Sequence, residues 1–208
     1  MAVDGEVVLP PGRFVDPARH TITVDGRPVG AQQLVYLLLH KPRGYLCTSH
    51  DPQGRLTFHR LLPPMTERLY SAGRLDVGSE GLLLVTNDGG LVHRMIHPRH
   101  EIAKTYEAWL DAPLDPDRER QLCAGMQLEG ESMRMESCRR LGGDHNGICY
   151  ELVLRQGKNR QIRRMMEAVG RRVRRLVRTR MGPLTLDGLR AGEWRKLTEE
   201  EVRRLKAE

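Results

Sequence analysis

Residues 72–89 read A-G-R-L-D-V-G-S-E-G-L-L-L-V-T-N-D-G and hold the clearest strand signal of the chain. The apolar run from Leu82 to Val85, between two polar turns, predicts a short buried strand. Ahead of it, Asp76 stands near Arg74 in a bend with three glycines, which let a backbone approach another group closely. Such an aspartate is either a turn residue that caps nearby amides or an aimed nucleophile. The residues of this stretch leave both interpretations open.

The composition excludes several broad classes of protein. The 208 residues suffice for one large domain or two small ones with a real core. No run of about 18 apolar residues is present, which argues against a membrane-spanning helix, and the first residues lack the order of a secretory signal. Four cysteines form no C-x-x-C pair and no zinc-like cluster, which is typical of free thiols in a reducing cytosol. We therefore expect a cytoplasmic protein with no membrane contact and no structural metal.

The positive charge is concentrated in one segment. The formal net charge is +7, yet the basic band (residues 155–180) alone contains eleven lysines and arginines against a single acid, Glu167. This density predicts an anionic partner, and we expect the band to bind nucleic acid through its phosphates with a strongly salt-dependent affinity. Only nine aromatic residues are present, which is few for a surface that binds RNA by base stacking alone.

Strands outnumber helices in the predicted element order. Apolar runs predict strands within 34–39, 45–48, 82–86, 104–110 and 148–154. Shorter strands are expected within 6–9 and 20–24, with a hairpin turn at Asp25-Gly26.

Two helices have clear boundary signals. The first follows an Asp115 N-cap, with Pro116 at its first position and Gly125 at its end. The second lies in N-R-Q-I-R-R-M-M-E-A-V-G (159–170), where Ile162, Met165, Met166 and Val169 follow helical spacing and Gly170 is the stop. Because the elements do not alternate regularly as β-α-β units, the sequence favours an α+β fold over a doubly wound parallel sheet.

Most familiar catalytic motifs are absent. The chain has no G-x-x-x-x-G-K-[ST] phosphate loop and no G-x-S-x-G motif. His93, His97 and His100 could meet only on a continuous helix, and Pro98 argues against one, so we expect no metal site and no cofactor. Asp76 remains, because an aspartate with a pKa of about 3.9 is ionised at neutral pH. A facing guanidinium would keep it charged and oriented even when it is partly buried.

Six stretches together carry a family resemblance. G-R-L-D followed by S-E-G-L-L-L-V-T-N-D-G resembles the catalytic motif of the ribosomal-RNA pseudouridine synthases, in the branch that acts at single sites of small- or large-subunit RNA. Four further stretches agree in order and spacing: H-K-P-R-G (40–44), C-T-S-H-D-P-Q-G-R (47–55), K-T-Y (104–106) and G-K-N-R-Q-I-R-R-M (157–165). Residues 181–198 are similar to the family's final strand and tail, so the resemblance covers residues 34–200.

The resemblance implies a fold and a domain organisation. The expected catalytic domain, 34–208, has the pseudouridine synthase fold, in which a central, mostly antiparallel sheet is flanked by a few helices. Its two subdomains, about 34–100 and 101–208, would enclose a catalytic cleft. Residues 1–33 resemble the final strands of a small N-terminal RNA-binding domain, followed by a linker.

The same resemblance implies an activity and its residues. Family members isomerise uridine to pseudouridine without a cofactor or a metal. By this likeness Asp76 is the catalytic aspartate, Tyr106 lies against the target base, and Arg163 pairs with the catalytic carboxylate. The sequence leaves open whether the aspartate adds to the ribose carbon, adds to the ring or only promotes elimination. Because the reacting carbon of a paired uridine is inaccessible, the nucleotide must turn out of the helix into a pocket. Leu176 would help to wall that pocket.

Further residues are expected to bind the RNA. Arg74 would serve the RNA backbone or the flipped nucleotide. The remaining candidates are the basic residues of the matching motifs: Lys41, Arg43, Lys104, Lys158, Arg160 and Arg164. Most of their affinity would come from phosphate contacts that carry little sequence information.

The sequence is compatible with three functions. The favoured one is an enzyme, a monomer, that modifies ribosomal RNA or a pre-ribosomal particle, with large-subunit RNA suggested by the 79–89 motif. The second is a non-catalytic RNA-binding module for ribosome assembly that kept the fold. The third is a pseudouridine synthase that acts on transfer RNA. An intact set of Asp76, Tyr106 and Arg163 argues against the second, because a pure binding module has no need of all three.

Overall fold

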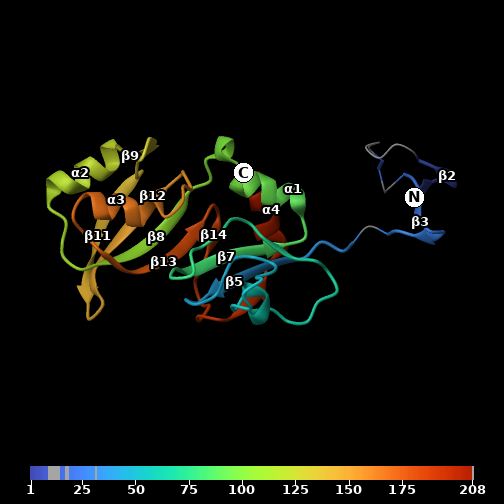
Figure 1. Ribbon diagram of the computed structural model, residues 1–208, viewed down its shortest axis with the longest axis horizontal. Helices are drawn as coiled ribbons and strands as arrows, with labels where there is room; N and C mark the ends of the chain where they lie inside the picture. The colour runs from blue at the N-terminus through green and yellow to red at the C-terminus, as the bar shows by residue number, and fades with distance from the viewer. Residues whose placement is uncertain (9–14, 17–18, 31, 208) are drawn as a thin grey trace. The chain divides into compact units, whose positions relative to one another are not determined.

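The computed structural model describes residues 1–8, 15–16, 19–30 and 32–207 (Figure 1). The chain divides into two compact units, Met1–Leu34 and Val35–Glu208. Among the described residues, none of the helices has the length and apolar character that a membrane span requires.

The first unit is a small antiparallel sheet. Its strands are β1 (Ala2–Val3), β2 (Glu6–Val7), β3 (Ile22–Val24) and β4 (Arg27–Pro28), in the order β2-β1-β3-β4. Asp25 and Gly26 both have positive φ, 50° and 74°, which is the backbone that the predicted hairpin turn requires. Leu9, which we expected in a strand, lies outside the described residues.

The second unit is built on one nine-stranded sheet. Its main path runs β11-β12-β8-β13-β7-β5-β15, while β6 pairs with β7 and β14 pairs with β13. The bounds are β5 Tyr36–Lys41, β6 Tyr70–Ser71, β7 Glu80–Thr86, β8 Lys104–Leu110, β11 Ser137–Asp144, β12 Gly147–Leu154, β13 Val173–Met181, β14 Leu184–Thr185 and β15 Trp194–Lys196. Among the described strands, every pair in this sheet is antiparallel except β13 with β7. The expected α+β class with a mostly antiparallel sheet is confirmed.

Strand β7 is buried along its whole length, as its apolar run predicted. Leu82 and Leu84 pack with α1 (Gly89–Ile96) and α4 (Glu199–Ala207). Leu83 and Val85, which point to the other face, pack with the short helix η1 (Phe58–Leu61).

Two helices cover the other end of the sheet. Figure 1 shows α2 (Pro116–Ala124) and α3 (Gln161–Ala168) beside β8, β11 and β12. Leu122, Met165 and Met166 from these helices enter one core cluster with β8 and β12. The helix boundaries follow the sequence signals: the Asp115 side chain accepts a hydrogen bond from the amide of Arg118, and α3 ends just before Gly170. A two-stranded sheet of β9 (Met126–Leu128) and β10 (Glu131–Met133) lies between α2 and β11 in the chain.

One expectation about the elements was wrong. The range 45–48 is not a strand, because only Leu46 forms an isolated bridge, to Thr57, after the turn at 42–44. The end of the chain returns to the β5–β7 end of the sheet. Strand β15 pairs with β5, and Leu205 of α4 packs with Leu82 and Leu84, so these late elements complete the β5–β7 end of the sheet.

Gly81 sets the contact between β7 and β13. Its φ is +113°, and an added Cβ would lie 2.3 Å from the carbonyl oxygen of Arg178. Only glycine allows the two strands to approach this closely in this conformation.

We expect Gly81→Ala to lower the free energy of unfolding by about 3 kcal/mol, through the strained φ and the clash with β13. For a chain of this size the thermal midpoint would fall by roughly 6–12 °C. Gly78→Ala is the matched control, because a Cβ there meets nothing within 4 Å. Equal midpoints for the two variants in calorimetry would contradict this account of the strand contact.

Candidate active site

A cavity of about 460 Å³ opens on the face of the sheet that α3 and α1 flank. Its lining comes from the segment before β7, the end of α1, strands β8 and β13, and the start of α3. Eight of the residues expected from sequence line it: Arg74, Asp76, Lys104, Tyr106, Lys158, Arg160, Arg163 and Leu176.

Asp76 lies half-buried in the turn that leads into β7. Its backbone carbonyl accepts hydrogen bonds from the amide of Ser79 (3.0 Å) and from Lys41 Nζ (3.3 Å). Within the described part of the chain, its carboxylate accepts no hydrogen bond and has no cation within 4 Å. The backbone of Asp76 is therefore fixed while its carboxylate stays available to the cavity.

Lys41, one of the residues expected to bind RNA, is engaged within the protein. Its side chain is fully buried, and its Nζ donates to the carbonyl oxygens of Pro42 (3.0 Å), Asp76 (3.3 Å) and Ser79 (2.8 Å). Burial lowers the pKa of Lys41. Since it ties both ends of the Asp76 turn to β5, it is a structural residue of the site.

Arg163 reaches the cavity from α3 and connects the two ends of the sheet. Its Nη1 donates to the carbonyl of Val173 (2.9 Å), and its Nη2 donates to the carbonyl of Gly78 (3.1 Å). Burial lowers the pKa of Arg163, and the nearby charge of Asp76 opposes that shift. The expected direct pairing with the carboxylate is therefore not formed, although the two charges are close enough to interact.

Tyr106 and Leu176 lie on neighbouring strands at the centre of the cavity wall. Leu176 is the register partner of Ala108 in β8, and Arg178 is the partner of Tyr106. Since side chains two positions apart share a face, Lys104 and Tyr106 on β8 lie beside Leu176 and Arg178 on β13. All four line the cavity.

Two of the expected RNA contacts are engaged elsewhere. Arg43 forms an ion pair with Glu80 (2.8 Å) and donates to the carbonyl of Arg174. Arg164 lies between Glu129 and Glu131, at 2.7 Å from each. Neither arginine belongs to the cavity lining.

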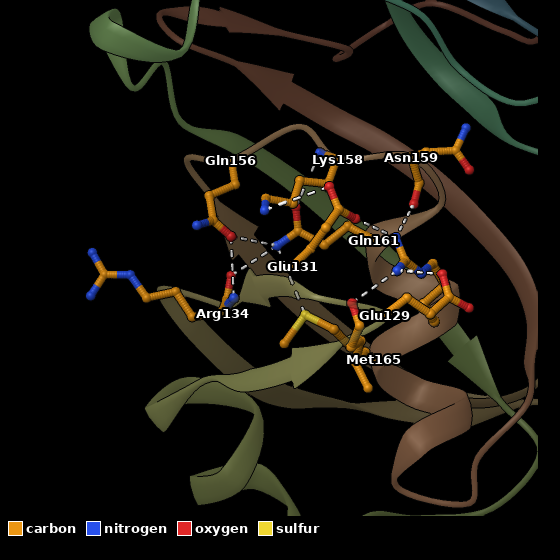
Figure 2. A network of polar contacts seen from close by, with 10 residues as sticks. Glu129, Glu131, Arg134, Gln156, Lys158, Asn159, Gln161 and Met165 are labelled. Atoms are coloured by element: carbon orange, nitrogen blue, oxygen red, sulfur yellow. Dashed lines mark hydrogen bonds and ion pairs between the residues drawn. The ribbon is translucent and has the colours of Figure 1, made fainter.

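A polar network fixes the loop that carries Lys158 and Arg160 (Figure 2). The amide of Gln161 donates to the carbonyl of Arg134 and to Gln156 Oε1, both at 3.1 Å, and its oxygen accepts from the backbone amide of Lys158. Gln161 is almost fully buried and was missed by sequence reasoning, because a glutamine at a helix start carries no signal of such a role.

The basic band is partly interior. Arg178 is 2% exposed, and Arg175 pairs with Glu80 at 3.1 Å while its guanidinium lies 4.7 Å from the ring centre of Trp109. The band therefore presents less positive charge to solvent than its composition suggested. Arg178 was missed by sequence reasoning, although it stands only two positions after Leu176, which was expected in the pocket wall.

The histidines lie near the cavity without a metal arrangement. As Pro98 predicted, α1 ends at Ile96 and a short helix, η2 (Pro98–His100), follows. In the described ranges, no group of three or more His, Cys, Asp or Glu side chains has an arrangement that could hold a metal ion.

Comparison with known proteins establishes the family. The family model described as RNA pseudouridylate synthase matches residues 35–168, more than half of the chain. A solved structure entitled "Crystal structure of pseudouridylate synthase" superposes with a TM-score of 0.74 at 29% identity, over 98% of this chain and 87% of that one. The chain therefore belongs to the RNA pseudouridine synthases and has their fold.

Named relatives agree with this assignment. A protein of Aquifex aeolicus, an uncharacterized RNA pseudouridine synthase, is 35% identical over 98% of this chain and 82% of its own length. The ribosomal small subunit pseudouridine synthase A of Escherichia coli K12 is 37% identical over 97% of this chain and 87% of its own length. The relative of that name in Salmonella typhimurium is 36% identical over similar shares.

Lys104 makes a testable contribution to the pH dependence of stability. Burial, together with the charge of Arg178, lowers the pKa of Lys104 from 10.5 to about 8. Between these values the unfolded chain binds the proton that the folded chain has lost, so this group adds stability as the pH rises from about 8 to 10.5. Below pH 8 both states are protonated and the full destabilising effect is present.

We therefore compare the free energy of unfolding of Lys104→Met with that of the unchanged protein. The difference should favour the variant most below pH 8 and should shrink as the pH rises toward 10.5. Urea unfolding at a series of pH values measures the difference. Lys196→Met, at an exposed position, is the control. A difference for Lys104→Met that stays constant with pH would show that Lys104 titrates normally.

Proposed function

We propose that this protein isomerises a uridine of ribosomal RNA to pseudouridine, with small-subunit RNA as the substrate. The observation that carries the proposal is the carboxylate of Asp76, which has no partner among the described residues, in a cavity with Tyr106, Leu176 and Arg163. The relatives from Escherichia coli and Salmonella typhimurium are named as small-subunit enzymes. The large-subunit preference suggested by the 79–89 motif finds no support in these names.

The roles follow from the positions of the side chains. A flipped uridine that enters the cavity meets Tyr106 and Leu176 on adjacent strands, which hold the base by contact with its faces. Asp76 attacks as an ionised nucleophile, and its orientation is set by the Lys41 and Ser79 contacts to its backbone. Arg163 lines the same cavity, where its charge interacts with that of Asp76.

The isomerisation balances without any added group. The bond from ribose C1′ to N1 of the base breaks, the base rotates in the cavity, and C5 joins C1′. The proton on C5 leaves and N1 gains one, so the substrate and the product have the same atoms. The chemistry requires a nucleophile, a place for the detached base and a way to stabilise charge.

The cations at the cavity opening serve the RNA backbone. Arg74 and Arg160 are exposed, and Lys158 is half-buried with Glu131 at 3.7 Å. We assign phosphate contacts to them, and an additional RNA contact to the small sheet of residues 1–34. We expect the protein to act as a monomer on ribosomal RNA or a pre-ribosomal particle.

Gene deletion followed by mapping of pseudouridines across all stable RNAs tests the substrate. Loss of one site in small-subunit RNA is the expected result. Loss of a site in large-subunit RNA would show that the small-subunit assignment is wrong. Loss of a site in transfer RNA would show that ribosomal RNA is not the substrate. If no site disappears, the cellular role as a modifying enzyme is wrong.

Asp76→Asn separates catalysis from binding. The variant keeps the shape of the side chain and removes the charge, so the single-turnover rate should fall by roughly 10³-fold or more. The dissociation constant for RNA should change by less than about twofold, since phosphate contacts dominate affinity. Asp187→Asn, at an exposed position, is the control. Full turnover by Asp76→Asn would rule out the carboxylate as nucleophile.

Arg160 and Arg164 give a matched test of the RNA-binding surface. Arg160 is exposed at the cavity, so Arg160→Gln should reduce the slope of log affinity against log salt concentration by about one. Arg164→Gln should reduce it less, because Glu129 and Glu131 already neutralise that charge. Filter binding across a range of salt concentrations measures both slopes. Equal reductions would show that the ion pairs of Arg164 open when RNA binds.

A further inference from the structure

A buried guanidinium with an unused donor lies in the cavity wall. Arg178 is 2% exposed, and its Nε donates to the carbonyl of Leu82 in β7 at 2.8 Å. Its Nη2 is also buried and has no hydrogen-bond partner among the described residues. Arg178 lines the cavity beside its register partner Tyr106.

A second cation stands next to this one. Lys104, on the same face of β8 as Tyr106, donates from Nζ to the carbonyl of Ile102 at 2.8 Å. In the described part of the chain, neither Lys104 nor Arg178 has a carboxylate within 4 Å. The inner wall of the cavity therefore carries positive charge that the protein itself does not neutralise.

This arrangement is costly unless a ligand completes it. A buried charge without a partner destabilises a protein, and a buried donor that makes no hydrogen bond costs about 1–3 kcal/mol. Arginine cannot relieve the cost by losing its proton. Unsatisfied buried groups of this kind occur where a bound molecule or a reaction uses them.

The part of the substrate that reaches Arg178 is the base. Exposed cations at the opening, Arg74 and Arg160, are placed for phosphates, which stay with the RNA strand outside. When a nucleotide flips, its base enters the pocket first and most deeply. Uracil presents two carbonyl oxygens, and these become strong acceptors if the base leaves the ribose as an anion.

We propose that Arg178, with Lys104 beside it, stabilises the negative charge that develops on uracil as its bond to the ribose breaks. The proposal rests on the proposed function. The electron pair of the C1′–N1 bond moves onto the ring and spreads over N1 and the carbonyl oxygens, while an Asp76 oxygen bonds to C1′. When C5 later displaces that oxygen, the carboxylate is restored, C5 loses its proton and N1 gains one.

Arg178 then acts at one stage of the reaction only. Uridine and pseudouridine carry no charge on the base, so the guanidinium favours the charged intermediate over both of them. Interactions that strengthen only as charge develops raise the rate rather than the affinity for substrate. The bond from Nε to Leu82 holds the guanidinium in place before the charge appears.

The acidity of the departing base provides the test. An RNA fragment that spans the mapped target carries either uridine or 5-fluorouridine there, and the fluorine makes the uracil anion more stable. Breakage of the C1′–N1 bond is followed in single turnovers by nuclease digestion and mass spectrometry. Arg178→Met should slow the reaction of uridine by roughly 10²–10³-fold. The reaction of 5-fluorouridine should slow at least tenfold less, with unchanged affinity for the RNA.

Arg180→Met is the matched control, because it removes the same charge from an exposed position of the same strand. It should change both rates by one common factor. Lys104→Met should also slow the reaction of uridine more than that of 5-fluorouridine, but by a smaller factor than Arg178→Met. This variant serves as the test if Arg178→Met does not fold. Equal losses for both substrates, or no loss with uridine, would overturn the role of Arg178. If the unchanged protein converts no uridine in this fragment, the proposed function fails instead.

Discussion

The site depends on the close parallel contact of β7 with β13. Glycine at position 81 lets the two strands meet, and the register places Val177 opposite Glu80 and Arg178 opposite Gly81. This contact joins the β5–β7 end of the sheet to the β8–β12 end. It also brings the Asp76 turn, which precedes β7, against the strand that carries Leu176 and Arg178.

Ion pairs of Glu80 reinforce the same contact between β7 and β13. Glu80 accepts hydrogen bonds from Arg175 on β13 and forms an ion pair with Arg43, which follows β5. Burial raises the pKa of Glu80, but the two arginines outweigh it and hold the pKa below its ordinary value. Some positive residues of the basic band thus bind elements of the protein together, and we propose that others bind RNA.

Elements with strong local signals could be predicted, and those that depend on distant partners could not. The apolar run at 82–85, the Asp115–Gly125 helix and the Gly170 stop follow from periodicity and capping, which act within a few residues. The range 45–48 looked like a strand, but among the described residues it pairs only through an isolated bridge between Leu46 and Thr57.

The candidate site shows the same division. Asp76, Tyr106 and Leu176 were placed by motif and meet in one cavity. The burial of Lys41 could not be predicted, because a lysine looks solvent-exposed in any sequence, whereas its Nζ donates to the carbonyl of the adjacent Pro42 and to those of Asp76 and Ser79 in the turn. The free donor of Arg178 depends on strand register, which a single sequence does not contain.

The position of β13 near the end of the sequence has a consequence for biosynthesis. Glu80 finds its partner Arg175 95 positions later, and β8 also needs β13 as its neighbour. Chain segments fold as they leave the ribosome, and distant strand pairs form slowly because a long loop must close first. The nascent chain therefore carries its carboxylate turn long before it can assemble the pocket around that turn, because the pocket requires β13 to have been made.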